Sequence, residues 1–447
     1  MIDAVYHFPR GFLWGSAVSC YQTEGNNTNS TWYSFEQNPT RVIHPCGLAA
    51  DWWGGGRWKE DFDRAAEGGH NAFRMGVEWS RVQPVPDKWD EHALDLYCEM
   101  AKRLIECGIT PMVTLHHFSD PIWLAEKGGW ENKDVVLQFA DYCWKVVGAL
   151  KSYVRLWLTI NEPNVYLVSG YLGGGGAAGI FPPAKKNLGA AFRVGHNMVR
   201  AHAAAYHAIH EVQPEARVSM AVHYRDMQPQ ASWLPLDKWV TRLQNHEFNE
   251  VIPEAVTTGI YKSAFGRLAI PEVKGTLDFY GLNYYTSHLV RFDLLKPLSL
   301  FGAGRFRKGA EISEGGFIAV EPDGFWRALK WVRRFKLPVI ITELGVNDRQ
   351  DDLRRRYLAL HLRQLWRAAN ASWGIEGFFH WTLVDNWEWE RGWTQRFGLW
   401  ELDPETQARH KRPSADFYAA ICQENGLSAG MVRQWAPETY DKLFPSG

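Results

Sequence analysis

Cysteine is scarce in this sequence and forms no recognisable pattern. Six cysteines occur among 447 residues, and no two of them are separated by only two residues. The C-x-x-C spacing that marks zinc sites and redox motifs is therefore missing. The first ten residues contain Asp3 and no apolar core segment, so they do not resemble a signal peptide. For a chain of this size without a secretion signal, buried free thiols and a cytoplasmic location are expected.

Long apolar runs and an excess of either charge are missing as well. No stretch comes near the roughly 20 consecutive apolar residues that a membrane helix needs. Lys and Arg total 49 against 50 for Asp and Glu, which gives a net charge of −1. A dedicated nucleic-acid binder shows a basic excess or a basic stripe. Neither a membrane nor a nucleic acid is therefore expected as a partner, and the sequence is silent on oligomeric state.

Motifs for cofactors and metals are also missing. The glycine run Gly173–Gly176 lacks the Lys and the Ser or Thr that complete a phosphate loop. His202, His207 and His210 fall in a helical stretch, where surface or core positions explain them without a metal ion. We therefore expect no cofactor and no metal.

Tryptophan, by contrast, is abundant, with 23 residues. Large flat rings fill protein cores, and they also stack on the apolar face of a sugar ring. Most of them are expected in the core, and the excess is a first indication of a carbohydrate ligand. The overall composition, 46% hydrophobic and 22% charged, is typical of a globular protein.

Short apolar runs alternate with longer helical patterns along the whole chain. The runs are rich in β-branched and aromatic residues, which is typical of strands buried on both faces of a parallel sheet. The eight predicted strands are Phe12–Val18, Ala72–Trp79, Thr110–His116, Val154–Ile160, Val218–Val222, Phe279–Tyr284, Val339–Thr342 and Phe378–Trp381.

Amphipathic helices are predicted between these strands. Asp90 is a candidate N-cap for a helix whose apolar residues recur at three- and four-residue steps, and Gly108 stands where that helix should end. The segment Asp352–Ser372 repeats the pattern, and Leu188–Gln213 is typical of a long, alanine-rich helix.

Eight strands, each followed by a helix or a long loop, predict an α/β fold with a single closed (β/α)8 barrel over residues 1–447. An open, doubly wound sheet is the alternative. It is disfavoured because no glycine-rich phosphate turn follows the first strand. The run Gly173–Gly176 comes soon after a strand end, and we interpret it as a loop over the site.

Polar residues gather where the predicted strands end, which is the end of a (β/α)8 barrel that carries the active site. Packing alone gives no reason for this distribution. In strand order they are Gln22 and Glu24; Arg74; His116 and His117; Asn161 and Glu162; Asn283 and Tyr285; Glu343; and Trp381.

Two of these residues, Glu162 and Glu343, are carboxylates at the ends of buried strands. A buried ionised Glu is costly unless it is paired, so one explanation is that each of them neutralises a nearby arginine. Glycoside cleavage is the other explanation, since it needs one protonated and one ionised carboxyl across the scissile bond, roughly 5–5.5 Å apart in retaining enzymes. The fourth and seventh strands lie on opposite sides of an eight-stranded ring. Arg74 and Tyr285 are candidates to hold Glu343 ionised.

Short motifs occur in a fixed order over nearly the whole chain. They are Phe12–Gly15, Tyr21–Gly25, Phe73–Arg74, Glu78–Arg81, Thr159–Pro163, Gly281–Thr286, Ile341–Glu343, Trp381–Trp389 and Arg396–Leu399. Together they resemble family 1 of the glycoside hydrolases, the β-glucosidase and β-galactosidase family.

This resemblance implies a role for each matching residue. Glu162, in Asn161-Glu162-Pro163, corresponds to the acid/base, and Glu343 corresponds to the nucleophile. Residues that correspond to supports around the two carboxyls are Arg74, Asn283 and Tyr285. Residues that correspond to the wall around the non-reducing sugar are Gln22, His117, Asn161, Trp381, Glu388 and Trp389. His116 is expected to be a core residue.

Glu388 also bears on the substrate class. Family members that act on 6-phosphorylated sugars typically carry Ser at this position, with a Lys and a Tyr shortly after it to hold the phosphate. Here Gln395 and Phe397 occupy the following stretch, so an unphosphorylated sugar is expected. Leu344, where the family usually has Asn, and Phe118, where it often has Trp, depart from the pattern. Leu344 is expected to point into packing, whereas Phe118 removes an indole N–H near the sugar, so the resemblance does not fix the fine specificity.

The leading hypothesis is a retaining β-glycosidase acting on a small β-glycoside or short oligosaccharide, most simply a β-glucoside, with galactosides and fucosides as further substrates. A transglycosidase would use the same covalent intermediate. A non-catalytic sugar-binding relative would be expected to lose one carboxyl, and a purely structural barrel has no use for the polar strand ends. The loops Gly170–Pro183 and Leu294–Gly316 are expected to shape the aglycone site.

Overall fold

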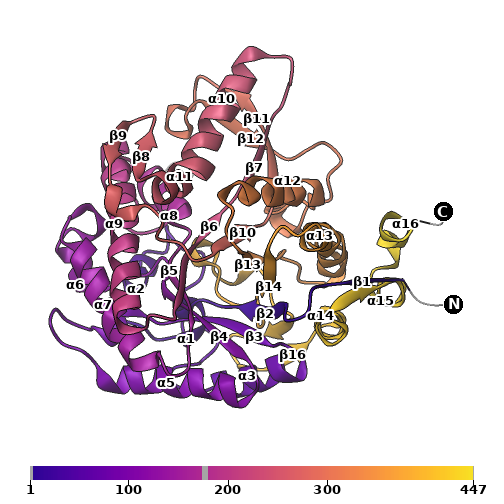
Figure 1. The fold of residues 1–447 in the computed structure, drawn as a ribbon, viewed down its shortest axis with the longest axis horizontal. Coiled ribbons are helices and arrows are strands. Elements are labelled where there is room, and N and C mark those ends of the chain that lie inside the picture. The colour runs from indigo at the N-terminus through magenta and orange to yellow at the C-terminus, as the bar shows by residue number, and fades with distance from the viewer. Residues whose placement is uncertain (1–3, 174–179, 446–447) are drawn as a thin grey trace.

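A computed structural model describes residues 4–173 and 180–445 of the chain. Its centre is a closed barrel of eight parallel strands in the spatial order β10-β13-β14-β2-β3-β4-β5-β6 (Figure 1). The barrel strands are β2 (Leu13–Ala17), β3 (Ala72–Gly76), β4 (Thr110–His116), β5 (Leu156–Asn161), β6 (Arg217–His223), β10 (Tyr280–Tyr284), β13 (Val339–Leu344) and β14 (Ile375–Trp381). The predicted (β/α)8 barrel is confirmed, and each predicted strand overlaps one of these eight.

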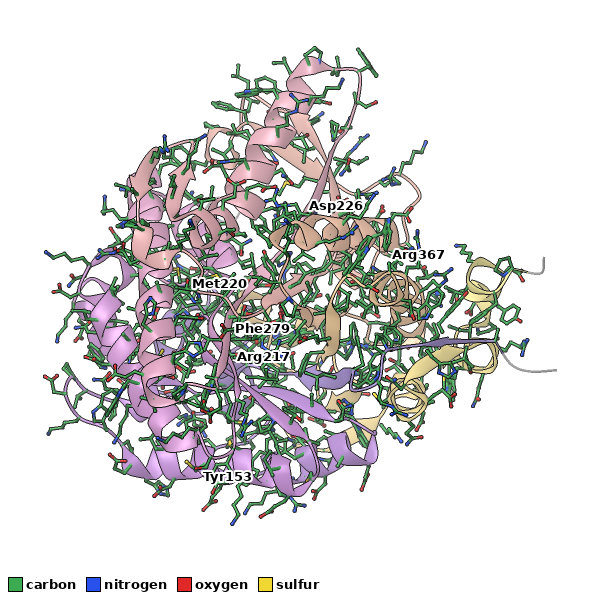
Figure 2. All side chains as sticks on the ribbon, in the orientation of Figure 1. Tyr153, Arg217, Met220, Asp226, Phe279 and Arg367 are labelled. Carbon is green, nitrogen blue, oxygen red and sulfur yellow. The ribbon has the colours of Figure 1, made fainter. Side chains whose placement is uncertain are left out.

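The barrel strands form because their side chains are apolar on both faces. Every residue of β3, β5, β10 and β13 is buried, one face toward the barrel interior and the other toward the surrounding helices. Met220 of β6 and Phe279, which precedes β10, lie in the crowded centre of the molecule (Figure 2). This packing fixes the strand ends in space, and with them the side chains that follow.

The helices surround the barrel, and their ends agree with the sequence signals. Asp90 accepts a hydrogen bond from the backbone N–H of Ala93 at 3.0 Å, and Gly108 adopts a positive φ of 75° just after the same helix ends. The helices are α1 (Cys20–Glu24), α2 (Thr31–Glu36), α3 (Trp58–Glu67), α4 (Trp79–Val82), α5 (Glu91–Glu106), α6 (Ile122–Glu126), α7 (Val135–Leu150), α8 (Pro163–Tyr171), α9 (Leu188–Val212), α10 (Pro235–Asn245), α11 (Val251–Thr258), α12 (Pro322–Val332), α13 (Asp352–Asn370), α14 (Pro413–Glu424), α15 (Ala429–Trp435) and α16 (Tyr440–Leu443).

Small sheets outside the barrel were not expected from the sequence. The three-stranded sheet β12-β11-β7 consists of β7 (Asp226–Pro229), β11 (Ser287–Phe292) and β12 (Gly302–Arg305). Because β7 and β11 begin three residues after β6 and β10 end, this sheet stands over one side of the barrel mouth. Buried Asp226, labelled in Figure 2, ties it to α12 through two hydrogen bonds from Arg327 of 2.9 and 2.7 Å.

The other short strands pair in two-stranded sheets. They are β1 (Val5–His7) with β17 (Gly426–Ser428), β8 (Ile260–Ser263) with β9 (Gly266–Ala269), and β15 (Trp400–Leu402) with β16 (Arg409–Lys411).

Among the described helices, none is both long and apolar enough to cross a membrane. All six cysteines are free thiols. The run Gly173–Gly176, which we predicted to be a loop over the site, lies outside the described residues from residue 174 onward.

Candidate active site

A cavity of about 580 Å³ opens at the carboxyl ends of the barrel strands. Its position is the one that (β/α)8 barrels use for catalysis. Most of the predicted site residues line it, and these are His117, Asn161, Glu162, Tyr285, Glu343, Trp381, Glu388 and Trp389. The structure thus brings together residues that lie up to 272 positions apart, from His117 to Trp389.

Glu162 stands between the end of β5 and the first turn of α8. Its backbone has a positive φ of 43°, and Pro163 follows at the first helical position, where its missing N–H costs nothing. Its Oε1 accepts hydrogen bonds from Asn283 at 2.8 Å and from Nδ1 of His223 at 3.0 Å. Both bonds end on the same oxygen.

Glu343 lies on β13 and binds different partners. Its Oε1 accepts a hydrogen bond from Arg74 at 2.7 Å, and its Oε2 accepts one from the Tyr285 hydroxyl at 2.6 Å. Both carboxylate oxygens are therefore held, one of them by a permanent cation. This geometry confirms the expected contacts of Arg74 and Tyr285 with Glu343.

Arg74 and Asn283 connect the two carboxyls from beneath the cavity. Arg74 is fully buried and donates to the side chains of Thr114 and Asn161 at 2.9 and 2.7 Å, in addition to Glu343. Asn283 donates to Asn161 at 3.2 Å as well as to Glu162. Because every member of this network is hydrogen-bonded, it holds the acids in fixed positions.

Burial and charge set the ionisation of the two carboxyls. Burial raises the pKa of Glu343 to about 7; Arg74 opposes this rise, and the charge on Glu162 adds to it. Burial also acts to raise the pKa of Glu162, but the charge and hydrogen bond of His223, with a smaller contribution from Asn283, bring it below its ordinary value. Arg74 beside Glu343 keeps its charge at any physiological pH, whereas the hydrogen-bond partners of Glu162 are an imidazole and a neutral amide.

Aromatic and polar side chains form one wall of the cavity. The ring of His117 stacks at 5.8 Å from that of Trp381 and at 6.1 Å from that of Trp389. Its Nε2 lies 3.0 Å from Nδ2 of Asn161. This is a wall that can present a ring nitrogen and apolar ring faces to a sugar.

Glu388 and Gln22 complete this side of the site. The amide of Gln22 donates to Oε2 of Glu388 at 3.3 Å and to the backbone oxygen of Trp387 at 2.6 Å. Burial, reinforced by the charge of Glu390, raises the pKa of Glu388 to about 8. Gln22 does not line the cavity itself and contacts the lining residue Glu388; Arg74 and Asn283 likewise do not line it and contact Glu343 and Glu162.

Other polar strand-end residues lie outside the cavity. Glu24 forms an ion pair with Arg81 at 2.6 Å, and His116 binds Asp120 at 3.0 Å, which confirms His116 as a core residue. Leu344 is fully buried in the core, and Phe118 lines the cavity with its ring 5.4 Å from that of Trp389.

His223 is the functional candidate that the sequence analysis missed. It ends β6, the fifth barrel strand, and contacts Glu162 directly. The run Val218–Val222 stops one residue short of it, so the end of the fifth strand contributed no residue to the strand-end set. Extending that strand by one residue would have found it.

The two carboxyls follow β5 and lie on β13, which are not opposite in the ring, as was expected, but are separated by β6 and β10. A (β/α)8 barrel whose mouth holds two buried carboxyls beside an aromatic wall has the architecture of a glycoside hydrolase. Residues 5–427 match the family model described as glycosyl hydrolase family 1. The chain belongs to this family and is a glycoside hydrolase.

Relatives in sequence and structure agree with this assignment. The chain is 32% identical to Beta-glucosidase A of Thermotoga maritima, covering 95% of this chain and 99% of the relative. It is 32% identical to a 1,4-beta-D-glucan glucohydrolase of Thermotoga neapolitana, with 94% and 99% covered. A beta-glycosidase from Pyrococcus horikoshii superposes with a TM-score of 0.89 at 32% identity, covering 97% of this chain and 98% of the other.

The family 1 β-glucosidase structure from Thermotoga maritima superposes with a TM-score of 0.88 at 31% identity, covering 95% of this chain and 100% of the other. That protein has also been solved in complex with glucoimidazole and with galacto-hydroximolactam.

Proposed function

We propose that this chain is a retaining β-glycosidase in which Glu343 is the nucleophile and Glu162 the acid/base. The observation that carries this assignment is the difference between their partners. Glu343 contacts the permanent cation Arg74 and the Tyr285 hydroxyl, while Glu162 contacts a titratable imidazole and the neutral amide of Asn283. The ionised carboxyl belongs beside the permanent charge.

The same contacts indicate which of the two carboxyls carries a proton. Two carboxyls facing one cavity raise each other's pKa, so near neutral pH the pair holds one proton. Arg74 favours the ionised form of Glu343, whereas no permanent cation is hydrogen-bonded to Glu162, so we assign the proton of the pair to Glu162. The resting pair then has the protonation that the first step requires.

The reaction proceeds in two displacements. Ionised Glu343 attacks the anomeric carbon, the bond to the aglycone oxygen breaks, and Glu162 gives its proton to that oxygen. The glycosylated Glu343 has lost its charge, so Glu162 now remains ionised and takes a proton from water. The water oxygen attacks the anomeric carbon and releases Glu343, so the product keeps the β configuration.

Glu388 supports an unphosphorylated sugar as the substrate. A carboxyl group beside the sugar hydroxyls can accept hydrogen bonds from them and, in its ionised form, repels a phosphate. The gluco- and galacto-configured ligands of the Thermotoga maritima relative support the same sugar class. We further propose a single catalytic domain over residues 1–447 and a cytoplasmic location, which the free thiols support.

The test is a panel of 4-nitrophenyl β-D-glycosides, comprising the glucoside, galactoside, fucoside and 6-phosphoglucoside. We expect hydrolysis of the unphosphorylated glycosides and little hydrolysis of the 6-phosphoglucoside. Proton NMR should show that the β-anomer of the sugar is released first. Initial release of the α-anomer would contradict the retaining mechanism. A preference for the 6-phosphoglucoside would contradict the role of Glu388.

A further inference from the structure

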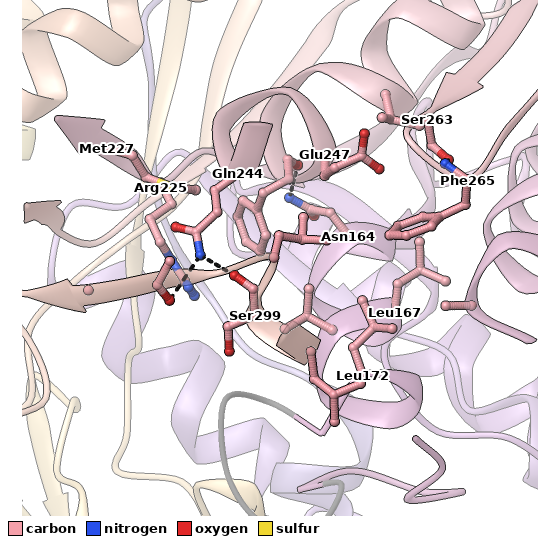
Figure 3. Close-up of a pocket in the computed structure, with 18 of the residues that line it drawn as sticks. Asn164, Leu167, Leu172, Arg225, Met227, Gln244, Glu247, Ser263, Phe265 and Ser299 are labelled. Atoms are coloured by element: carbon pink, nitrogen blue, oxygen red, sulfur yellow. Dashed lines mark hydrogen bonds between the residues drawn. The ribbon is translucent and has the colours of Figure 1, made fainter. Parts of the chain in front are cut away.

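Figure 3 shows residues that line a second cavity, of about 340 Å³. Its lining residues come from α8, from the first turn of α9, from the end of α10, and from the segments around β11 and β12. Its wall is mostly apolar, with Leu167, Leu172 and Phe265 among the contributing side chains. Val168, Arg225, His288 and Gly304 line both this cavity and the active-site cavity, so the two share one wall.

Arg225, on this shared wall, has a guanidinium group without a direct ion pair among the described residues; burial lowers its pKa, and the charge of Glu162 acts to raise it. Among the described residues, its side chain forms no hydrogen bond and no ion pair, and its one contact of note is with the ring of Phe248, 4.6 Å away. A half-buried guanidinium with unused N–H groups is costly, because it has lost part of its water without gaining an acceptor. The guanidinium therefore has N–H groups for which the described chain supplies no acceptor, and an anionic ligand group could accept from them.

Three buried atoms on residues that line the two cavities also lack hydrogen-bond partners among the described residues. They are Oδ1 of Asn164, Nε2 of His223 and Nδ1 of His288. Asn164 lines the second cavity, His223 the active-site cavity and His288 both. Buried polar atoms are normally satisfied, so unsatisfied ones on the walls of the two cavities are positions where a polar ligand group can bind.

We propose that the aglycone of the natural substrate carries a carboxylate that pairs with Arg225, with the apolar part of the aglycone extending into the second cavity. This inference rests on the proposed glycosidase function. A carboxylate matches the planar fork of a guanidinium and forms paired hydrogen bonds with it. The apolar wall, with Leu167 and Phe265, suits the hydrocarbon or aromatic body of the same molecule. The substrate class is therefore β-glycosides of apolar carboxylic acids linked through a hydroxyl group.

The position of Arg225 is consistent with this use. It follows β6 by two residues, and His223, which ends that strand, contacts the proposed acid/base Glu162. The leaving oxygen must lie beside Glu162, so an aglycone on this side of the cavity passes Arg225 before it reaches the second cavity.

The experiment compares acid and carboxamide versions of the same aglycone. The probes are 3-carboxyphenyl and 3-carbamoylphenyl β-D-glucoside, and the corresponding two-ring pair built on 4′-substituted biphenyl-4-yl β-D-glucoside. For at least one pair, the wild type should prefer the acid by about tenfold in kcat/KM, the size of one charge-assisted interaction. Arg225→Met should abolish this preference, and Arg225→Lys should keep part of it.

Arg291→Met is the matched control, because Arg291 is an exposed arginine on β11 that lines neither cavity. It should keep the wild-type preference. Since the acid-to-amide ratio is compared between variants, the intrinsic reactivity of each leaving group cancels, and a general loss of folding lowers both rates alike.

Equal kcat/KM for acid and amide in both wild-type pairs, together with normal hydrolysis of neutral 4-nitrophenyl β-D-glucoside, would overturn this inference and leave the proposed function intact. An Arg225→Met variant that keeps the acid preference would overturn it as well. A wild type inert on the neutral glucoside would overturn the proposed function, and the inference with it.

Discussion

Removal of the Tyr285 hydroxyl tests how Glu343 is kept ionised. In the Tyr285→Phe variant, Oε2 of Glu343 loses a donor that stands 2.6 Å away, while Arg74 still binds Oε1. The ring is retained and keeps its neighbours, since it lies 5.6 Å from the ring of His223 and 6.2 Å from that of Phe397. The change is therefore confined to one hydrogen bond.

The size of the effect follows from the charge on the acceptor. A hydrogen bond to a charged group contributes about 1.5–3 kcal/mol, and one pKa unit corresponds to about 1.4 kcal/mol. The Tyr285 hydroxyl lowers the pKa of Glu343, so its loss should raise that pKa by about 1–2 units above the value of about 7. The nucleophile must be ionised, so the acid limb of the rate profile should move to higher pH. Below this limb, kcat/KM should fall by about 10- to 100-fold relative to wild type.

The assay is kcat/KM against pH for 2,4-dinitrophenyl β-D-glucoside, whose good leaving group makes little demand on the acid/base. Tyr206→Phe is the control, because Tyr206 also donates to a carboxylate, Asp278 at 2.7 Å, but does not line the active-site cavity. Its profile should match wild type. An acid limb for Tyr285→Phe that stays in place, or moves to lower pH, would refute the reasoning.

Three further changes have expected outcomes. Glu162→Ala should slow the release of poor leaving groups by about 10²–10⁴-fold and that of 2,4-dinitrophenolate far less, measured as kcat/KM across aryl glucosides of graded leaving-group pKa. Glu388→Gln should raise KM for 4-nitrophenyl β-D-glucoside by about tenfold, because a neutral amide accepts weaker hydrogen bonds from sugar hydroxyls; an unchanged KM would remove Glu388 from the sugar site. Burial raises the pKa of Glu36 to about 7, so its protonated form stabilises the fold at low pH and this contribution is lost as pH rises from about 4.5 through 7. Glu36→Gln should therefore gain up to about 3 kcal/mol over wild type between pH 4.5 and pH 8 in urea unfolding, and a constant difference across this range would contradict the prediction.

The barrel was predictable from the sequence because its strands are buried on both faces. Burial on both faces leaves a continuous apolar run, which is visible without any knowledge of the partners. The chain direction then places all strand ends at one mouth, so Glu162 and Glu343 were recognisable as a pair before any distance was known. Helix ends were predictable where a local signal exists, as at Asp90, whose side chain accepts the Ala93 N–H.

The parts that the sequence did not predict depend on contacts between distant segments. The link from Arg74 through Asn161 to Asn283 joins three strands, and no local pattern specifies which donor meets which acceptor. The second cavity forms where α8, the segment around Phe265 and the sheet β12-β11-β7 meet. Each of these segments alone resembles an ordinary amphipathic element, and Arg225 resembles a surface arginine until its lack of a partner is seen.

The central claim, that Glu343 is the nucleophile of a retaining enzyme, is tested most directly by azide rescue of Glu343→Gly. The variant should be nearly inactive on 2,4-dinitrophenyl β-D-glucoside, and sodium azide should restore turnover by attacking from the space that the carboxylate occupied. The product should be the α-glucosyl azide, identified by proton NMR, while Glu162→Ala with azide should give the β-glucosyl azide. A β-glucosyl azide from Glu343→Gly, or wild-type activity of that variant without azide, would contradict the account.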